Sequence, residues 1–236
     1  MIELKNISHN YGGKEVLNNL SINFEKEKLT SILGSSGSGK TTILRLIAGL
    51  EIPHKGEILI HNKTVSANGK LITAPDKRNV GFVFQDLALW PHFTVYQNVT
   101  FAPKERNYEN IENSVKDIIN FLGINELADK YPHQLSGGQK QLAAIARALA
   151  LKPNILLMDE PFANLDVKIK RRIISLLIKI KTEFNLTIIY VTHDHKESFS
   201  LADYVCLINK GKIEEYGTVE EIKQSKNEYV KYFLEY

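Results

Sequence analysis

The sequence predicts an α/β fold in which a parallel sheet carries a helical insertion. Apolar runs typical of strands alternate with helical patterns in both halves of the 236-residue chain, and this alternation is expected of a parallel sheet. Between them, strand signals give way to helical periodicity. We therefore predict an α/β core of residues 1–85 and 153–236, and a helical subdomain of residues 86–152.

The N-terminal part predicts strands joined by tight turns before the first helix. Residues 2–7 and 20–24 have strand patterns, with a turn at Tyr11-Gly12-Gly13 between them. Residues 29–33 predict a buried strand that enters a glycine-rich loop. A helix is then expected over 41–49, with Gly49 as its stop.

The remaining elements follow the same reasoning. A hairpin or loop excursion is expected over 65–76, where Asn68-Gly69 is a turn signal. The other predicted elements are strands at 58–60, 80–84, 154–158 and 186–191, and helices at 111–122 and 137–151.

Composition and charge exclude several classes of protein. A net charge of +3 is too small to indicate nucleic-acid binding, which usually needs a concentrated basic face. The single cysteine, Cys206, rules out an internal disulfide. No run of about 18 apolar residues could span a bilayer, and Met1–Lys5 lacks the apolar region of a signal peptide. Any role in transport therefore requires membrane partners.

A phosphate-binding loop is the first motif that carries chemistry. The segment from Gly34 to Thr41 fits G-x-x-x-x-G-K-[ST] and lies between a predicted strand and a predicted helix. Its glycines allow successive N–H groups to point inward, where the helix N-terminus adds positive charge. Lys40 would approach the β- and γ-phosphates, and the Thr41 hydroxyl would hold Mg²⁺. The motif predicts a nucleotide site.

Hydrolysis requires more than this loop, and two carboxylates at a strand end could supply it. Asp159 and Glu160 follow the apolar strand 154–158, where ligands of an open α/β sheet bind. Side chains alternate along a strand, so one carboxylate can reach Mg²⁺ while its neighbour reaches the attacking water. We assign Asp159 to the metal and Glu160 to the water as general base. Such a pair alone is more often a solvated strand end; the presence of the phosphate loop reverses this and favours catalysis.

A histidine at a third strand end could contact the γ-phosphate. His193 lies just past the strand that ends at Val191. A lone histidine is more often structural, but its placement parallels that of the other two strand ends.

The segment Leu135-Ser136-Gly137-Gly138-Gln139 resembles the signature motif of the ATP-binding cassette family. It predicts a serine N-cap at the start of a helix, whose first backbone N–H groups are free to bind an anion. The resemblance implies a P-loop NTPase with a RecA-like core, an antiparallel β subdomain and a helical subdomain. It also implies that the signature completes the site of a second subunit, so that two ATP are sandwiched in a head-to-tail dimer.

Further motifs match the family one by one. Tyr11 stands where the family has an aromatic residue that stacks on adenine, and Gln85 matches a glutamine that contacts Mg²⁺ and the water. The segment Ala163–Asp166 resembles the loop between the two sites, and His193 matches the switch histidine. One departure is Leu142, where the family usually has arginine, so any interaction of that arginine is lost or replaced.

The resemblance implies three sets of site residues. The expected catalytic residues are Glu160, His193 and Gln85, and the expected Mg²⁺ ligands are Thr41, Gln85 and Asp159. The expected nucleotide-binding residues are Tyr11, Gly34, Ser35, Ser36, Gly37, Ser38, Gly39, Lys40, Thr41, Thr42, Ser136, Gly137, Gly138, Gln139 and Asp166.

The segment Phe84–Val95, which contains Trp90, is similar to that of ATPases of bacterial importers that use a substrate-binding protein. The resemblance implies a peripheral subunit on the cytoplasmic side of the membrane, paired with itself or a homologous cassette and with permease subunits. Aromatic residues around Trp90 would receive the permease, or would pack in the core. The excursion Asn62–Asp76 resembles importers of ions such as iron(III) or phosphonate. The alternatives are an exporter ATPase, a soluble ATPase with this cassette, and a nucleotide-binding module without turnover. Many relatives carry a further C-terminal regulatory domain.

Overall fold

The computed structural model describes residues 1–106, 110–163 and 165–235, whose strands form a five-stranded and a six-stranded sheet. The strands are β1 (Ile2–Tyr11), β2 (Lys14–Phe24), β3 (Leu29–Leu33), β4 (Lys55–Ile60), β5 (Lys63–Ala67), β6 (Lys70–Leu71), β7 (Val80–Val83), β8 (Ile155–Asp159), β9 (Thr187–Val191), β10 (Tyr204–Asn209) and β11 (Lys212–Thr218). The α-helices are α1 (Lys40–Ala48), α2 (Val95–Glu105), α3 (Ile111–Leu122), α4 (Gly137–Leu149), α5 (Val167–Glu183), α6 (His195–Leu201), α7 (Val219–Lys223) and α8 (Glu228–Glu235). Short 3-10 helices cover Pro75–Lys77, Asn125–Leu127 and Pro132–Gln134.

The six-stranded sheet confirms the predicted parallel core. Its order is β11-β10-β3-β9-β8-β7, and all neighbours are parallel except β10 and β11. The central strands β3, β8 and β9 are buried along their whole length, which matches their continuous apolar sequences. Their C-terminal ends meet at one edge, and β8 ends at Asp159 opposite Val191 of β9. This edge carries the predicted phosphate loop, Asp159, Glu160 and His193.

The second sheet is antiparallel, with the order β2-β1-β4-β5-β6. Its first two strands are longer than predicted: β1 continues to Tyr11, and β2 begins at Lys14. Asn6 and Asn19 have positive φ values of 52° and 48°, and the β1–β2 register shifts along the pair. These irregularities interrupt the period-2 alternation that would reveal one long hairpin.

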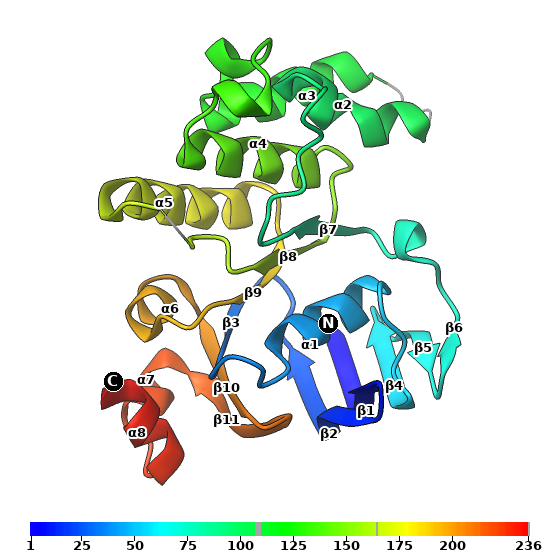
Figure 1. Cartoon of the computed structure of the whole chain (residues 1–236), viewed down its shortest axis with the longest axis vertical. Helices are drawn as coiled ribbons and strands as arrows, with labels where there is room; N and C mark the ends of the chain where they lie inside the picture. Colours follow the sequence, from blue (N-terminus) through cyan, green and yellow to red (C-terminus); the bar gives the residue numbers. More distant parts are fainter. Residues whose placement is uncertain (107–109, 164, 236) are drawn as a thin grey trace.

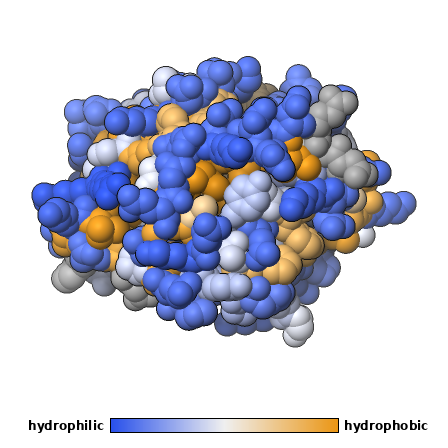
Figure 2. All heavy atoms as spheres, turned by 90° about the horizontal axis from the view of Figure 1, so that it is seen from above, coloured by the Kyte–Doolittle hydropathy of each residue, from blue (hydrophilic) through white to orange (hydrophobic). Residues whose placement is uncertain are grey.

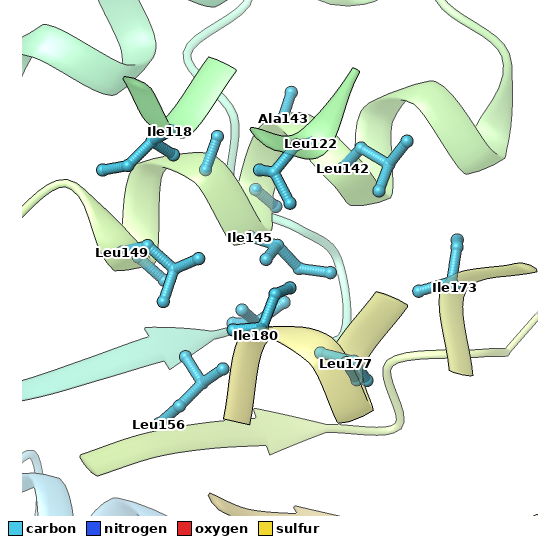
Figure 3. Close-up of a cluster of buried hydrophobic side chains, with 14 of the residues drawn as sticks. Ile118, Leu122, Leu142, Ala143, Ile145, Leu149, Leu156, Ile173, Leu177 and Ile180 are labelled. Atoms are coloured by element: carbon cyan, nitrogen blue, oxygen red, sulfur yellow. The ribbon is translucent and has the colours of Figure 1, made fainter. Parts of the chain in front are cut away.

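Figure 1 shows how the layers stack, with α1 between the two sheets and α5 on the opposite side of the parallel sheet. Apolar residues of α1 pack with those of both sheets in one buried cluster. A second cluster joins the other face of the parallel sheet to α3, α4 and α5, and Figure 3 shows Leu156 of β8 facing Leu177 and Ile180 of α5. Burial of two apolar faces thus holds the strand ends in place.

The predicted helical region contains α2, α3 and α4, which lie together at one end of the molecule (Figure 1). The sequence interpretation missed α2, although Thr94 and Gln97 form a capping box at its start. Leu142, which replaces the expected arginine, is buried in the cluster of Figure 3. Seen from this end, the surface mixes hydrophilic side chains with smaller apolar areas (Figure 2). The boundary of a separate helical subdomain at residues 86–152 stays a prediction.

Three smaller features can be compared with what the sequence predicts. The excursion forms a β5–β6 hairpin whose turn residues Asn68 and Gly69 both have positive φ, as a type I′ turn requires. The strands β10 and β11 were missed, although Cys206 lies buried within the apolar run of β10. None of the helices in the described parts of the chain combines the length and apolar character needed to cross a bilayer.

Candidate functional site

The predicted phosphate loop connects β3 to α1 and curls at its glycines. Gly39 caps α1 with a φ of 104°, and a Cβ atom there would lie 2.6 Å from Leu17 Cδ2. Both the left-handed backbone and the close approach require glycine. The N-terminus of α1 therefore opens directly into the loop, as an anion site requires.

Lys40 reaches back across this loop. Its Nζ donates to the carbonyl oxygens of Gly34 (2.8 Å) and Ser35 (2.9 Å). Burial lowers the pKa of Lys40, while the carboxylates of Glu160 and Asp159 raise it. The two carboxylates favour the charged form of the buried Lys40, and this charge can attract the negative phosphates.

Thr41 and Asp159 bring two hard oxygen donors together although they lie far apart in sequence. The Thr41 hydroxyl donates to Asp159 Oδ1 at 2.9 Å. Burial raises the pKa of Asp159, and the hydrogen bond from Thr41 lowers it. In the same loop, Ser38 Oγ is buried without a hydrogen-bond partner, which leaves an orphaned polar atom beside the proposed phosphate site. This donor set fits a Mg²⁺ nucleotide, because Mg²⁺ prefers oxygen ligands.

An open pocket of about 490 Å³ joins Tyr11 to this loop. The predicted residues that line it are Tyr11, Ser36, Gly37, Gly39, Lys40, Thr41, Thr42, Gln85 and Glu160. Lys14, Glu15 and Val16 also line it, and the sequence interpretation missed them. Their signal was their position directly after the Tyr11-Gly12-Gly13 turn, which pairs Lys14 and Glu15 with the end of β1.

Glu160 and His193 lie at adjacent strand ends, as predicted. Glu160 has a φ of 44°, and its N–H donates to the Val191 carbonyl at 3.1 Å. Glu160 thus leaves β8 in a left-handed conformation that is uncommon for a residue other than glycine. His193 Nδ1 lies 3.7 Å from Glu160 Oε1. Both residues and Gln85 line a neighbouring pocket of about 360 Å³, so Gln85 and Glu160 belong to both pockets.

An ion cluster that sequence reasoning missed lies beside His193. Lys170 Nζ contacts Asp194 Oδ2 at 2.7 Å and Glu197 Oε2 at 2.6 Å. Asp194 also caps α6 by accepting from the Glu197 N–H. Burial raises the pKa of Glu197, and Lys170 lowers it. The cluster ties the loop that carries His193 to α5 and so restrains the backbone next to the histidine.

The signature segment forms the predicted cap of α4. Ser136 Oγ accepts from the Gln139 N–H, and Gln139 Oε1 accepts from the Ser136 N–H at 2.9 Å. A Cβ atom at Gly138 would lie 2.5 Å from Ile169 Cγ2 of α5, so glycine permits the close packing of these helix starts.

Asp166 lies at that junction and caps α5 by accepting from Lys168 N and Ile169 N at 3.0 and 2.9 Å. Among the described residues, neither the signature segment nor Asp166 lines either of the two pockets. Asn164 of the predicted Ala163–Asp166 loop lies outside the described residues. The structure thus brings Tyr11, the phosphate loop, Gln85 and the strand-end residues together, and it keeps the signature segment apart from their pocket.

Comparison with known proteins identifies relatives of this arrangement. The ABC transporter family matches residues 17–163. The sulfate/thiosulfate import ATP-binding protein CysA of Pseudomonas syringae pv. tomato is 43% identical over 240 residues, which cover 99% of this chain and 72% of that protein. The spermidine/putrescine import ATP-binding protein PotA of Spiroplasma citri is 44% identical over 224 residues, or 94% of this chain and 63% of that protein.

A solved structure agrees with these relatives. The dimeric structure of MJ0796, a bacterial ABC transporter cassette, superposes with a TM-score of 0.81 at 33% identity and covers 93% of this chain and 99% of that one. These two relatives are named for the import of sulfate/thiosulfate and of spermidine/putrescine, so they do not support the predicted iron(III) solute. Matches of this length and identity confirm the resemblance read from the motifs. The chain belongs to the ABC transporter family and is one of its ATP-hydrolysing cassettes.

Proposed function

We propose that this chain is the ATP-hydrolysing subunit of a membrane importer, bound peripherally at the cytoplasmic face by permease subunits. The observation that carries the proposal is that Tyr11, the phosphate loop and Glu160 line one pocket. The import ATP-binding relatives support the direction of transport. Residues 86–152 are proposed to form the helical subdomain that receives the permease.

Different residues of the pocket would bind different parts of ATP. Tyr11 would stack on the adenine ring, and Lys40 with the loop N–H groups would hold the phosphates. Thr41, Asp159 and Gln85 would hold Mg²⁺, which when bound neutralises charge on the phosphate oxygens. The Thr41–Asp159 contact of 2.9 Å supports this assignment, since both oxygens already meet at one point.

Glu160 is proposed to accept the proton of the attacking water. Its carboxylate lines the pocket beside Lys40 and Gln85, and His193 lies 3.7 Å from it. Gln85 would orient the water, and His193 would contact the γ-phosphate. The Lys170 cluster beside His193 supports this role because it restrains the loop on which the histidine lies.

The signature segment is proposed to act on a second subunit. Ser136, Gly137, Gly138 and Gln139 form a helix N-terminus that does not line the pocket of their own chain. A head-to-tail dimer would bring this N-terminus to the γ-phosphate of the partner, where its N–H groups favour negative charge. Asp166, at the start of α5, would lie between the two sites. The dimeric MJ0796 cassette supports this arrangement.

Mixing variant subunits tests the shared site. Lys40→Ala and Ser136→Arg homodimers are expected to be inactive, but their mixture should recover ATPase activity from one competent site per mixed dimer. Mixtures of Lys40→Ala with Glu160→Gln are the matched control, because both changes affect the same half of the site and no competent site can form. Equal recovery in both mixtures, or full activity of isolated monomers, would exclude the sandwich.

An aromatic cluster is proposed to receive the permease. Trp90 packs against Phe101 with ring centroids 4.6 Å apart, and the Arg147 guanidinium lies 5.4 Å from the Trp90 ring. Arg147 also donates to the carbonyls of Leu87 and Ala88, which both have positive φ. The loop is therefore held in place, while Phe101 stays 37% exposed. Exposed aromatic side chains beside an arginine are typical of interfaces.

Phe101→Asp is expected to remove copurifying integral membrane subunits while ATPase activity in solution persists, because a carboxylate cannot be buried in an apolar interface without large cost. The measurement is affinity purification from detergent-solubilised membranes of cells that express the native transporter. Tyr131→Asp is the matched control, since Tyr131 is 39% exposed but lies outside the cluster. Retention of the membrane subunits by Phe101→Asp would refute this docking site.

A further inference from the structure

The side chain of His193 lies mostly in solvent. It is 70% exposed, and its Nδ1 lies 3.7 Å from Glu160 Oε1, which is longer than a hydrogen bond. Packing of its own ring therefore does little to orient it. Where the ring lies relative to a γ-phosphate depends instead on the backbone on either side of the histidine.

The residues on both sides of His193 are held by hydrogen bonds. The N–H of Thr192 donates to the Ile32 carbonyl of β3 at 3.2 Å. The N–H of Asp194 donates to Thr192 Oγ1 at 3.2 Å, and Asp194 Oδ1 accepts from the Glu197 N–H at 3.0 Å. These bonds fix the first side of the turn to the sheet and the second side to the start of α6.

Lys170 adds a contact from a different element, α5. Its Nζ lies 2.7 Å from Asp194 Oδ2 and 2.6 Å from Glu197 Oε2, which are the lengths of charge-assisted hydrogen bonds. One ammonium thus joins the residue directly after His193 to the first turn of α6. The side chains of Lys170 and Glu197 are only 22% and 4% exposed, so solvent screens their attraction less than that of a surface pair.

The helix that carries Lys170 is itself fixed in the core. Ile173, Leu177 and Ile180 of α5 are buried, and they belong to the apolar cluster that covers one face of the parallel sheet (Figure 3). Lys170 lies three residues before Ile173, so the two side chains are neighbours on the helix surface. The ion cluster therefore connects the turn at His193 to an element that is packed against the sheet.

We propose that Lys170 is a positioning residue for His193, and that its ion pairs with Asp194 and Glu197 hold the turn where the histidine can contact the γ-phosphate. Among the described residues, Lys170 lines the pocket that contains His193 and not the pocket that contains Tyr11 and the phosphate loop. Lys170 therefore acts on the rate of hydrolysis rather than on binding of ATP. This inference rests on the proposed role of His193.

Lys170→Met removes the charge and keeps an unbranched side chain. We expect it to lower kcat for ATP hydrolysis about tenfold while KM for ATP changes less than about twofold, because small misplacements of a group near the reacting atoms reduce the rate. Lys170→Arg should recover most of the activity, since a guanidinium can contact both carboxylates. Lys179→Met, at an exposed position of the same helix, is the matched control and should behave as the wild type does. Steady-state phosphate release on the full chain measures both constants.

A second variant separates positioning from loss of folding, because Lys170→Met leaves the Glu197 carboxylate buried without its cation. Asp194→Asn keeps a side-chain oxygen for the cap of α6 and keeps the pair of Lys170 with Glu197, but it loses the negative charge beside His193. It should melt close to the wild type and show the same pattern, a lower kcat with little change in KM. A wild-type kcat in either folded variant overturns the inference.

A double-mutant cycle tests whether Lys170 acts through His193. In a His193→Ala background, Lys170→Met should cause no further loss of rate, because no imidazole remains to be positioned. Single-turnover hydrolysis with the protein in excess over ATP measures these slow rates. If Lys170→Met lowers the rate by the same factor with and without the histidine, Lys170 acts independently of His193 and the inference is overturned.

The outcomes distinguish this inference from the proposed function. If His193→Ala hydrolyses ATP at the wild-type rate, the proposed role of His193 fails and this inference fails with it. If His193→Ala is impaired but Lys170→Met keeps the wild-type kcat, or lowers it equally in both backgrounds, only this inference is overturned.

Discussion

Glu160→Gln is expected to reduce kcat for ATP hydrolysis by at least about 100-fold, since general base catalysis typically contributes a factor of 10² to 10⁴. Glutamine has nearly the same size and can still contact water, but it cannot accept the proton. Glu160 lies at the edge shared by both pockets, beside Lys40 and Gln85 in one and His193 in the other. The change should therefore remove chemistry and leave the binding surface in place.

ATP binding should persist in this variant, and the ATP-bound dimer should accumulate because it is no longer resolved by hydrolysis. Steady-state phosphate release measures the loss of kcat. Size-exclusion chromatography with and without ATP measures the accumulation of the ATP-bound dimer. Glu183→Gln, at the exposed end of α5, is the matched control and should hydrolyse ATP at the wild-type rate. Unchanged turnover in Glu160→Gln would remove Glu160 from the role of base.

Arg78→Met is expected to reduce the free energy of unfolding by about 3–5 kcal/mol. Arg78 is 3% exposed, and its guanidinium donates to Thr73 O, Val65 O and Ser66 Oγ at 3.0, 3.1 and 2.6 Å. It also donates to the Leu46 and Ile47 carbonyls at 2.9 and 2.8 Å. Those carbonyls end α1, where the helix dipole favours a cation. Burial lowers the pKa of Arg78 to about 10, so the group stays charged at neutral pH.

Methionine would fill much of the space but leave these acceptors unsatisfied in the interior. The melting temperature should fall by about 10 °C, given roughly 2–4 °C per kcal/mol for a chain of this size. Arg78→Lys should be intermediate, since one ammonium cannot reproduce the planar fork. Arg171→Met, at an exposed position on α5, is the control and should melt as the wild type does. A melting temperature unchanged in Arg78→Met would show that the acceptors find other partners.

Most of the central sheet and the phosphate loop could be predicted because their signals are local. The strand Leu29–Leu33 and the helix that ends before Gly49 have the bounds, within one residue, that the sequence predicts. The cap at Ser136 was also predictable, since both of its hydrogen-bond partners lie within four residues. These features depend on side chains and backbone angles of neighbouring residues.

Features built from distant segments could not be predicted in the same way. The length of the β1–β2 hairpin could not be predicted because positive-φ residues and register shifts interrupt its alternating pattern. The helix α2 contains Pro103, and a proline within a sequence segment argues against predicting a helix there. The buried position of Arg78 depends on acceptors from α1 and from β5. Arginine is mostly an exposed residue, so no local pattern marks it as part of the core.

The sequence by itself determined that this protein is an ATP-binding cassette, and it predicted which residues at the strand ends would act on the nucleotide, because those motifs are short and carry their own backbone geometry. Only the tertiary structure decided that Tyr11 shares a pocket with the phosphate loop. It also decided that the signature helix lies against α5 and outside that pocket. The physical reason is that these contacts depend on sheet order and on burial of apolar faces, which are properties of the whole chain.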